Sequence, residues 1–68
     1  MHRLRVVRQE RGLTVKKLAK EIGVSSATIS RIERNEQDPS LALVRKLCTM
    51  FKQDGLAAHD FVNTEQAA

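Results

Sequence analysis

Apolar residues between positions 15 and 22 recur at the spacing of one face of a helix. The spacing i, i+3, i+4 and i+7 joins Val15, Leu18, Ala19 and Ile22. Thr14 precedes this pattern with a side chain that favours the N-cap position. Gly23 follows it and tolerates the left-handed backbone that ends many helices. The sequence therefore predicts an amphipathic helix over 15–22.

A second short helix is predicted over residues 26–34. Val24 can return to the core and Ser25 is a good N-cap, so a turn of only a few residues sets the two helices at a steep angle. At about 100° per residue, Ile29 and Ile32 fall on one side. The other side has little bulk and consists of Ser26, Ala27, Ser30, Arg31 and Arg34. Such a face is suited to a DNA groove.

The remaining patterns predict three more helices and no strand. They cover about 2–11, about 41–51 and about 54–62, with Asp54 as the N-cap of the last. The helix over 41–51 has an apolar arc of about 180°, whereas roughly 100° is common for a surface helix. We expect an all-α domain of about five helices over residues 1–62 and a frayed tail over 63–68.

Positive charge is concentrated in the first half of the chain. The 68 residues have a net charge of +4, but residues 1–34 hold nine Lys/Arg against three Asp/Glu and residues 35–68 hold three against five. A basic half that contains a short-turn helix pair favours a polyanion as the partner. The alternative is an ordinary solvated surface, and the acidic half is a candidate for self-association.

Several functional classes lack the residues that they need. Cys48 is the single cysteine, so no internal disulfide can form. The chain has only two histidines, His2 and His59, and the three residues do not have the spacing of a zinc site. No nucleophile stands at a recognisable distance from a base, and no glycine-rich loop could hold a phosphate. No apolar run is long enough to span a bilayer. We expect a cytoplasmic protein that is not an enzyme and that needs no metal or cofactor.

Short strings around the two central helices carry a family resemblance. They are Arg11-Gly12-Leu13-Thr14, Leu18-Ala19, Gly23-Val24-Ser25, Thr28-Ile29-Ser30-Arg31-Ile32-Glu33-Arg34 and Pro39-Ser40-Leu41. With them the chain resembles the Cro/C1-type helix-turn-helix family, also called the XRE family, over about residues 2–62. The resemblance implies a five-helix, lambda-repressor-like fold whose third helix enters the major groove of double-stranded DNA. It further implies a transcriptional regulator, by family habit a repressor, that binds a palindromic operator as a homodimer.

The resemblance also assigns roles to individual residues. Ser26 and Ala27 correspond to the usual base readers, and Arg31 one turn later can bond guanine through two hydrogen bonds. The alternative for Arg31 is a phosphate contact, which adds affinity and little specificity. The expected phosphate or auxiliary contacts are Thr14, Lys16, Lys17, Ser25, Thr28, Ser30 and Arg34.

The start of the first central helix departs from the family pattern. Val15 stands where the family often has a glutamine that bonds a phosphate, and Lys16 and Lys17 replace the usual acids. Cations in a first helical turn oppose the helix dipole at a cost of a few tenths of a kcal/mol each. A DNA phosphate at this N-terminus would offset that cost. The alternative is that both are solubilising lysines.

Two further expectations concern stability and assembly. The resemblance pairs Arg8 with Glu33 in a partly buried ion pair, the alternative being two independent solvated charges. The apolar arc of the helix over 41–51 and the apolar residues near the C-terminus together provide more apolar surface than so small a core can bury. A homodimer interface is therefore expected at Leu56, Phe61 and Val62. Phe61 could instead be a core residue that covers the first helix.

Two other functions stay open beside the homodimeric repressor. The first is an antitoxin-type interaction protein that binds a toxin through its C-terminal half and regulates its own transcription. The second is the DNA-binding module of a longer regulator, with a regulatory protein as a possible partner.

Overall fold

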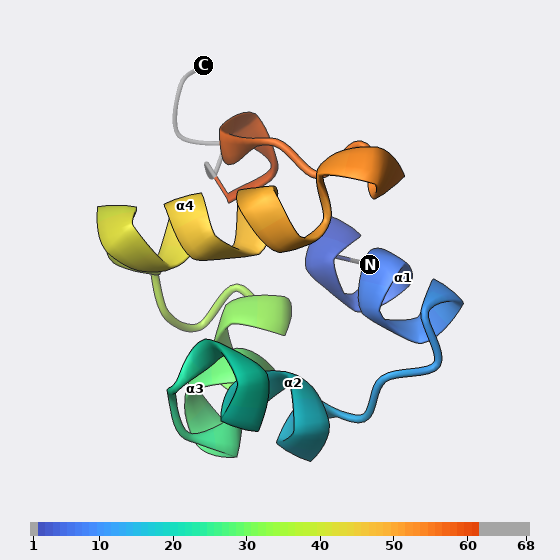
Figure 1. Ribbon diagram of the computed structural model, residues 1–68. Helices are drawn as coiled ribbons and strands as arrows, with labels where there is room; N and C mark the ends of the chain where they lie inside the picture. Colours follow the sequence, from blue (N-terminus) through green and yellow to red (C-terminus); the bar gives the residue numbers. More distant parts are fainter. Residues whose placement is uncertain (1, 62–68) are drawn as a thin grey trace.

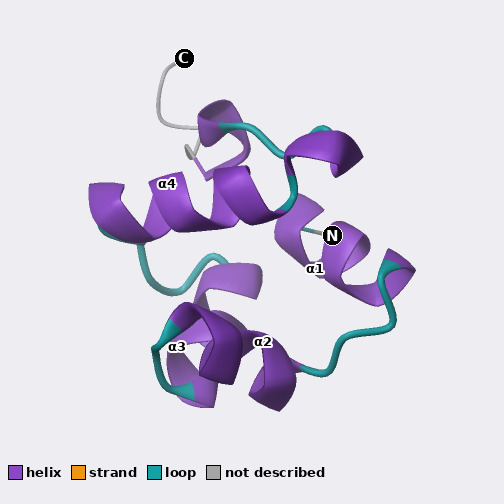
Figure 2. Ribbon diagram, in the orientation of Figure 1, coloured by secondary structure: helices purple, strands orange, loops and turns teal. Residues whose placement is uncertain are grey.

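Helices are the only regular elements in residues 2–61, the part of the chain that the computed structural model describes. Four α-helices, α1 (Arg3–Glu10), α2 (Val15–Ile22), α3 (Ser26–Glu33) and α4 (Leu41–Met50), precede two short 3-10 helices, η1 (Lys52–Asp54) and η2 (Ala58–Phe61). In Figure 1, α4 crosses the molecule, with α2 and α3 packed together below it and η1 and η2 above it. Short loops join the helices (Figure 2), and the all-α prediction is confirmed.

A side chain caps the N-terminus of each α-helix. Thr14, Ser25 and Ser40 accept a hydrogen bond from the backbone N–H three residues later, as the sequence predicts. His2 caps α1 through Nδ1, which accepts from the Leu4 N–H at 2.9 Å. Because these caps satisfy N–H groups that have no partner inside the helix, they fix where each short helix begins.

One apolar core holds the helices together. Phe51, directly after α4, is fully buried in it. The other buried apolar side chains come from all four α-helices and from the segment between η1 and η2; they are Leu4, Val7, Leu18, Ala19, Ile22, Ile29, Ile32, Leu43, Leu47 and Leu56. Each of the four α-helices therefore presents its apolar face inward, and the polar faces of α2 and α3 remain outside.

The five-helix count is not confirmed, because two 3-10 helices stand where the fifth α-helix was expected. Asp54 ends η1 and does not cap a following helix. Gly55 has a φ of 79°, a left-handed conformation that stops the helical turn. A new turn begins when Asp60 Oδ2 accepts a hydrogen bond from the Ala57 N–H at 2.9 Å. The expected end at Val62 and the tail over 63–68 lie outside the described residues.

His2 joins the start of α1 to the last described element. Its imidazole lies 5.4 Å from the Phe61 ring, centroid to centroid, while Nδ1 caps α1. Burial lowers the pKa of His2, and the carboxylates of Glu33 and Asp60 partly oppose that effect. A protonated Nδ1 cannot accept the Leu4 N–H, so the folded state favours the neutral imidazole.

We expect this histidine to make folding sensitive to mild acid. The pKa of His2 is lower in the folded chain, so the unfolded chain binds more protons once the pH is below about 6.5. The free energy of unfolding should therefore fall as the pH is lowered from about 6.5. Urea unfolding at several pH values measures the effect. His2→Asn keeps a capping side chain that does not titrate, so it should remove this part of the pH dependence. An unchanged dependence in that variant would assign the loss to other groups.

Candidate nucleic-acid interface

The turn between α2 and α3 sets the second helix against the first. Gly23 adopts φ 88°, and its N–H donates to the Ala19 carbonyl at 2.8 Å, as does the Val24 N–H at 3.0 Å. Val24 is half-buried and packs against the core. Ser25 then caps α3, so only three residues separate the two helices. This is the helix-turn-helix geometry that the sequence predicts.

The two sides of α3 differ in burial. Ile29 and Ile32 are buried in the core, and Ser26, Ala27 and Arg31 are exposed. The first two exposed residues have short side chains, so another molecule can approach the backbone of α3 closely. Arg31 supplies the long donor on the same side of the helix. The structure thus brings the three expected base readers onto one outer surface.

Hydroxyl groups gather at the N-termini of α2 and α3. Thr14 Oγ1 accepts from the Lys17 N–H at 3.0 Å, and Ser25 Oγ accepts from the Thr28 N–H at 3.2 Å. The Ser25 and Thr28 hydroxyls are hydrogen-bonded to each other at 2.9 Å. A hydroxyl that accepts in a cap still has its own proton to donate. Thr14 therefore keeps a donor that suits an anion, whereas one proton of the Ser25 and Thr28 pair is used between them and only the other stays available.

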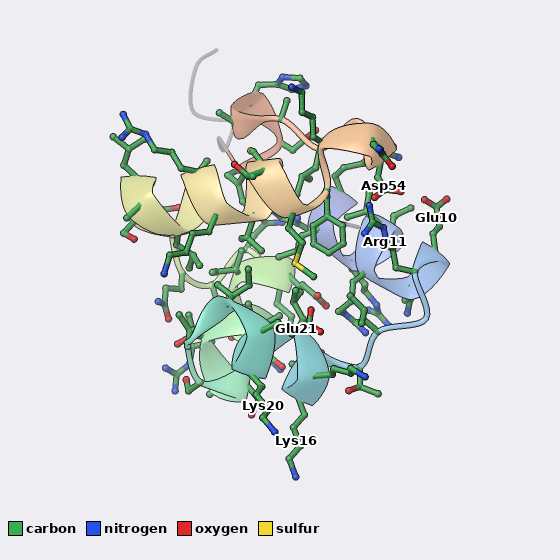
Figure 3. All side chains as sticks on the ribbon, in the orientation of Figure 1. Glu10, Arg11, Lys16, Lys20, Glu21 and Asp54 are labelled. Carbon is green, nitrogen blue, oxygen red and sulfur yellow. The ribbon has the colours of Figure 1, made fainter. Side chains whose placement is uncertain are left out.

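Three lysines lie along the exposed side of α2. Lys16 and Lys17 are exposed, and the first turn of α2 contains no acidic residue. Lys16 and Lys20 point away from α4, toward the end of the molecule formed by α2 and α3 (Figure 3). Within residues 2–61 no ion pair involves these lysines or Arg31. Positive charge, capped N-termini and the outer face of α3 are thus close together.

Ser30 and Arg34 lie in different surroundings from the outer face. Ser30 is half-buried and lines a polar cleft of about 220 Å³ between α1, α2 and α3. Arg34 lines the same cleft and pairs with Glu36 at 3.1 Å in an exposed ion pair, the two side chains being 60% and 56% exposed. Since such a pair contributes at most about 1 kcal/mol, a phosphate can replace Glu36 as the partner.

Arg8 and Glu33 form an ion pair that joins α1 to α3. Arg8 Nε donates to Glu33 Oε2 at 2.7 Å and Nη2 donates to Oε1 at 3.1 Å. Nη1 donates to the Leu13 carbonyl at 2.8 Å, which ties the loop before α2 to the same guanidinium. The side chains are only 10% and 6% exposed. The pair therefore positions all three helices that surround the proposed DNA surface.

Two arginines of the basic half bind Asp54, away from the candidate DNA surface, and the sequence did not predict these contacts. Arg11 pairs with Asp54 at 2.8 Å and lies over the Phe51 ring, and Arg3 donates to the Asp54 carbonyl at 3.0 Å. Figure 3 shows Arg11 and Asp54 far from Lys16 and Lys20. Asp54 is more than 40 positions away in the sequence, so no local pattern could reveal the contact.

Of the residues expected at a dimer interface, Leu56 and Phe61 do not share an exposed surface. Leu56 is 4% exposed and belongs to the core of its own domain, which corrects its assignment to an interface. Gly55 is the physical reason, because the reversal there turns the next side chain inward. Phe61 is half-buried and packs against the core and His2. Val62 lies outside the described residues.

Two further properties of residues 2–61 bear on the site. No group of three or more His, Cys, Asp and Glu side chains in this range could hold a metal ion. None of its helices has the length and hydropathy to cross a bilayer.

Comparison with known proteins gives consistent matches. A family profile described as helix-turn-helix matches residues 4–54. The HTH-type transcriptional regulator SutR of Escherichia coli (strain K12) is 44% identical over 46 residues, which are 68% of this chain and 26% of SutR. The HTH-type transcriptional repressor RghR of Bacillus subtilis (strain 168) is 48% identical over 50 residues, 72% of this chain and 37% of RghR.

A third relative is named as an antitoxin. Antitoxin HipB of Escherichia coli O6:H1 is 43% identical over 44 residues, 65% of this chain and 47% of HipB. The chain thus spans about a quarter to a half of the length of these three relatives. No solved structure gives a significant match.

Loss of the Arg8 and Glu33 pair should destabilise the domain strongly. Glu33→Ala leaves a buried guanidinium without its partner, so we expect the free energy of unfolding to fall by about 3 kcal/mol in urea unfolding. Glu36→Ala is the matched control, because it breaks an exposed pair and should cost less than about 1 kcal/mol. Equal effects of the two substitutions would contradict a structural role for the buried pair.

Proposed function

We propose that this chain, which belongs to the helix-turn-helix family of DNA-binding transcriptional regulators, binds a specific DNA sequence through α3 in the major groove. The family match over residues 4–54 confirms the resemblance predicted from the sequence. The observation that carries the proposal is the outer side of α3, where short side chains and one arginine are exposed beside two capped helix N-termini, that of α2 with two exposed lysines in its first turn. Sequence specificity and phosphate binding are then supplied by neighbouring groups.

Base reading is assigned to three residues of α3. Arg31 has the length and the paired donors to bond guanine O6 and N7, a contact worth about 1 to 3 kcal/mol of discrimination. Ala27 offers a methyl group that fits beside the thymine methyl. Ser26 both donates and accepts, so it adjusts to the base that the other two select.

Phosphate contacts are assigned to the groups around this face. Lys16 and Lys17, at the start of α2, neutralise phosphates of the DNA backbone. Arg34, which forms an exposed ion pair with Glu36, can bind a phosphate in place of that carboxylate. The remaining contacts in this proposal are hydroxyls, those of Thr14, Ser25, Thr28 and Ser30. Because Thr28 and Ser30 are half-buried, we assign them an auxiliary role that supports the exposed groups.

Selection of bound duplexes from random DNA tests the proposal directly. We expect one enriched palindromic sequence whose half-site centres are one helical turn apart, about 34 Å. Binding should weaken steeply as salt rises, because phosphate contacts release counterions. If selection enriched no sequence, specific recognition by α3 would be ruled out.

Substitutions should separate base reading from phosphate contact. Arg31→Ala should relax the preference at one or two base positions, whereas Lys16→Ala and Lys17→Ala should weaken binding to all sequences alike. Each lysine substitution should also reduce the slope of log affinity against log salt by about 1. Fluorescence anisotropy with specific and random duplexes measures both effects. Equal losses on the two duplexes for Arg31→Ala would reassign that residue to phosphate.

We propose that the protein represses transcription and does not activate it. The similarity to RghR, a protein named as a transcriptional repressor, supports it. Repression by occupation of the operator requires only the DNA face. A reporter placed behind the selected palindrome should be expressed less when the protein is present.

We assign the homodimer interface to the start of α4. Leu41 is the large apolar side chain that residues 2–61 leave exposed, at 66%. It stands at the rim of a groove of about 300 Å³ whose other lining residues are Asp38, Pro39, Val44, Ala58 and Phe61. A two-fold axis would place each Leu41 in the groove of the other protomer, so this surface can complement itself. The groove contains no cation, which separates it from the DNA face.

Leu41→Glu should disrupt this dimer without disturbing the fold. The side chain is exposed in the single chain, so the helical content of the folded chain should be retained, while sedimentation should give a dimer dissociation constant raised at least about tenfold. Affinity for the palindrome should fall with it, and affinity for a half-site should not. Gln53→Glu adds the same charge at an exposed position of η1 and is the control. A variant that stays dimeric would exclude Leu41 from the interface.

An antitoxin is the second candidate, favoured by the similarity to HipB. In that case the chain would bind a toxin as well as its own operator. An adjacent reading frame whose product is toxic alone and co-purifies with this chain would establish it. A third candidate, the DNA-binding module of a longer regulator, is favoured by the match to only part of SutR.

A further inference from the structure

A second groove lies between the end of α2 and the second half of α4. It has a volume of about 560 Å³ and is lined by Glu21, Ile22, Arg45, Lys46, Thr49 and Met50. Ile22 is buried and Met50 half-buried, so the floor is apolar, and the other four residues are exposed at the rim. None of the lining residues is a proposed DNA contact, and Lys16 and Lys17 lie at the other end of α2.

Opposite charges stand on the two walls of this groove. Glu21 belongs to α2 and lies on the side that faces α4, whereas Lys16 and Lys20 point away (Figure 3). Arg45 and Lys46 belong to α4. None of these three rim charges takes part in an ion pair within residues 2–61. They are available to charges on another molecule, with an excess of positive charge.

We propose that this groove binds an amphipathic helix of a partner protein, with apolar side chains on the floor and carboxylates toward Arg45 and Lys46. The groove is open along its length, unlike the enclosed pockets that bury most of a small ligand. Its apolar floor and the Glu21 carboxylate disfavour a nucleic-acid backbone. Met50 gives the floor a flexible side chain that can adapt to the bound residue. The inference rests on the proposed function, since it supplies the surface through which a DNA-bound regulator meets a protein.

A designed peptide is the probe for this groove. It has about 16 residues, long enough to form a helix, with leucines along one face and glutamates on both flanks. We expect it to shift the amide signals of isotope-labelled protein saturably at Glu21, Ile22, Arg45, Lys46, Thr49 and Met50. A scrambled peptide of the same composition keeps the charge and loses the apolar face, so it should produce no localised shifts.

Charge reversal at the rim tests the same contact from the protein side. Lys46→Glu should weaken peptide binding about fivefold. Lys52→Glu makes the same change in charge outside the groove and should leave the affinity within about twofold of the original. Equal losses in both variants, or equal binding of the scrambled peptide, would overturn the proposal in favour of general electrostatic attraction.

Two further outcomes would also overturn it. Shifts centred on Lys16 and Lys17 would place the peptide on the DNA face, and signals of the groove that move on dilution of the free protein would assign the groove to a second copy of this chain. DNA binding is measured on the same sample. Failure of the peptide with intact DNA binding refutes the groove alone, and failure of DNA binding refutes the proposed function while the peptide result still stands.

Discussion

The guanidinium of Arg8 is the group on which the arrangement of the first three helices depends. It belongs to α1, bonds the Glu33 carboxylate at the end of α3 twice, and bonds the Leu13 carbonyl just before α2. A buried charge with three hydrogen bonds tolerates little displacement, because each lost bond leaves a polar group without a partner. Apolar packing brings the helices together without fixing their exact rotation. The ion pair supplies that orientation, and with it the direction in which α3 faces.

Local signals predicted most of the fold. Thr14, Ser25 and Ser40 were recognisable as caps because each bonds a backbone group only three residues away. The exposed positions of α3 followed from helical periodicity alone, since burial of Ile29 and Ile32 determines which residues face outward. In these short elements the sequence window contains both partners of the interaction, so chemistry and spacing are sufficient.

The C-terminal region could not be predicted in the same way. Asp54 is a reasonable N-cap by its side chain, yet Arg11 and Arg3, from the other end of the chain, hold it at the end of η1. Leu56 resembles a surplus surface residue in the sequence and is buried once Gly55 reverses the backbone. Both outcomes depend on contacts between distant segments. The pair of Arg34 and Glu36 in the candidate site is different, because the two residues are only two positions apart and the sequence analysis did not predict their contact.

The caps of α2 and α3 have a consequence for how binding is distributed between enthalpy and entropy. Thr14 and Ser25 are already held by their own helices, so a contact through either hydroxyl immobilises almost nothing new. Lys16 and Lys17 are long, exposed chains that lose rotamer freedom when they meet a phosphate. In the proposed complex, the rigid hydroxyls would define where the backbone of the duplex sits, and the mobile lysines would add attraction over a wider range of positions. The N-terminus of α2 would thus combine one rigid hydrogen-bonding group, Thr14, with two flexible cations, Lys16 and Lys17, that can follow DNA of varying shape.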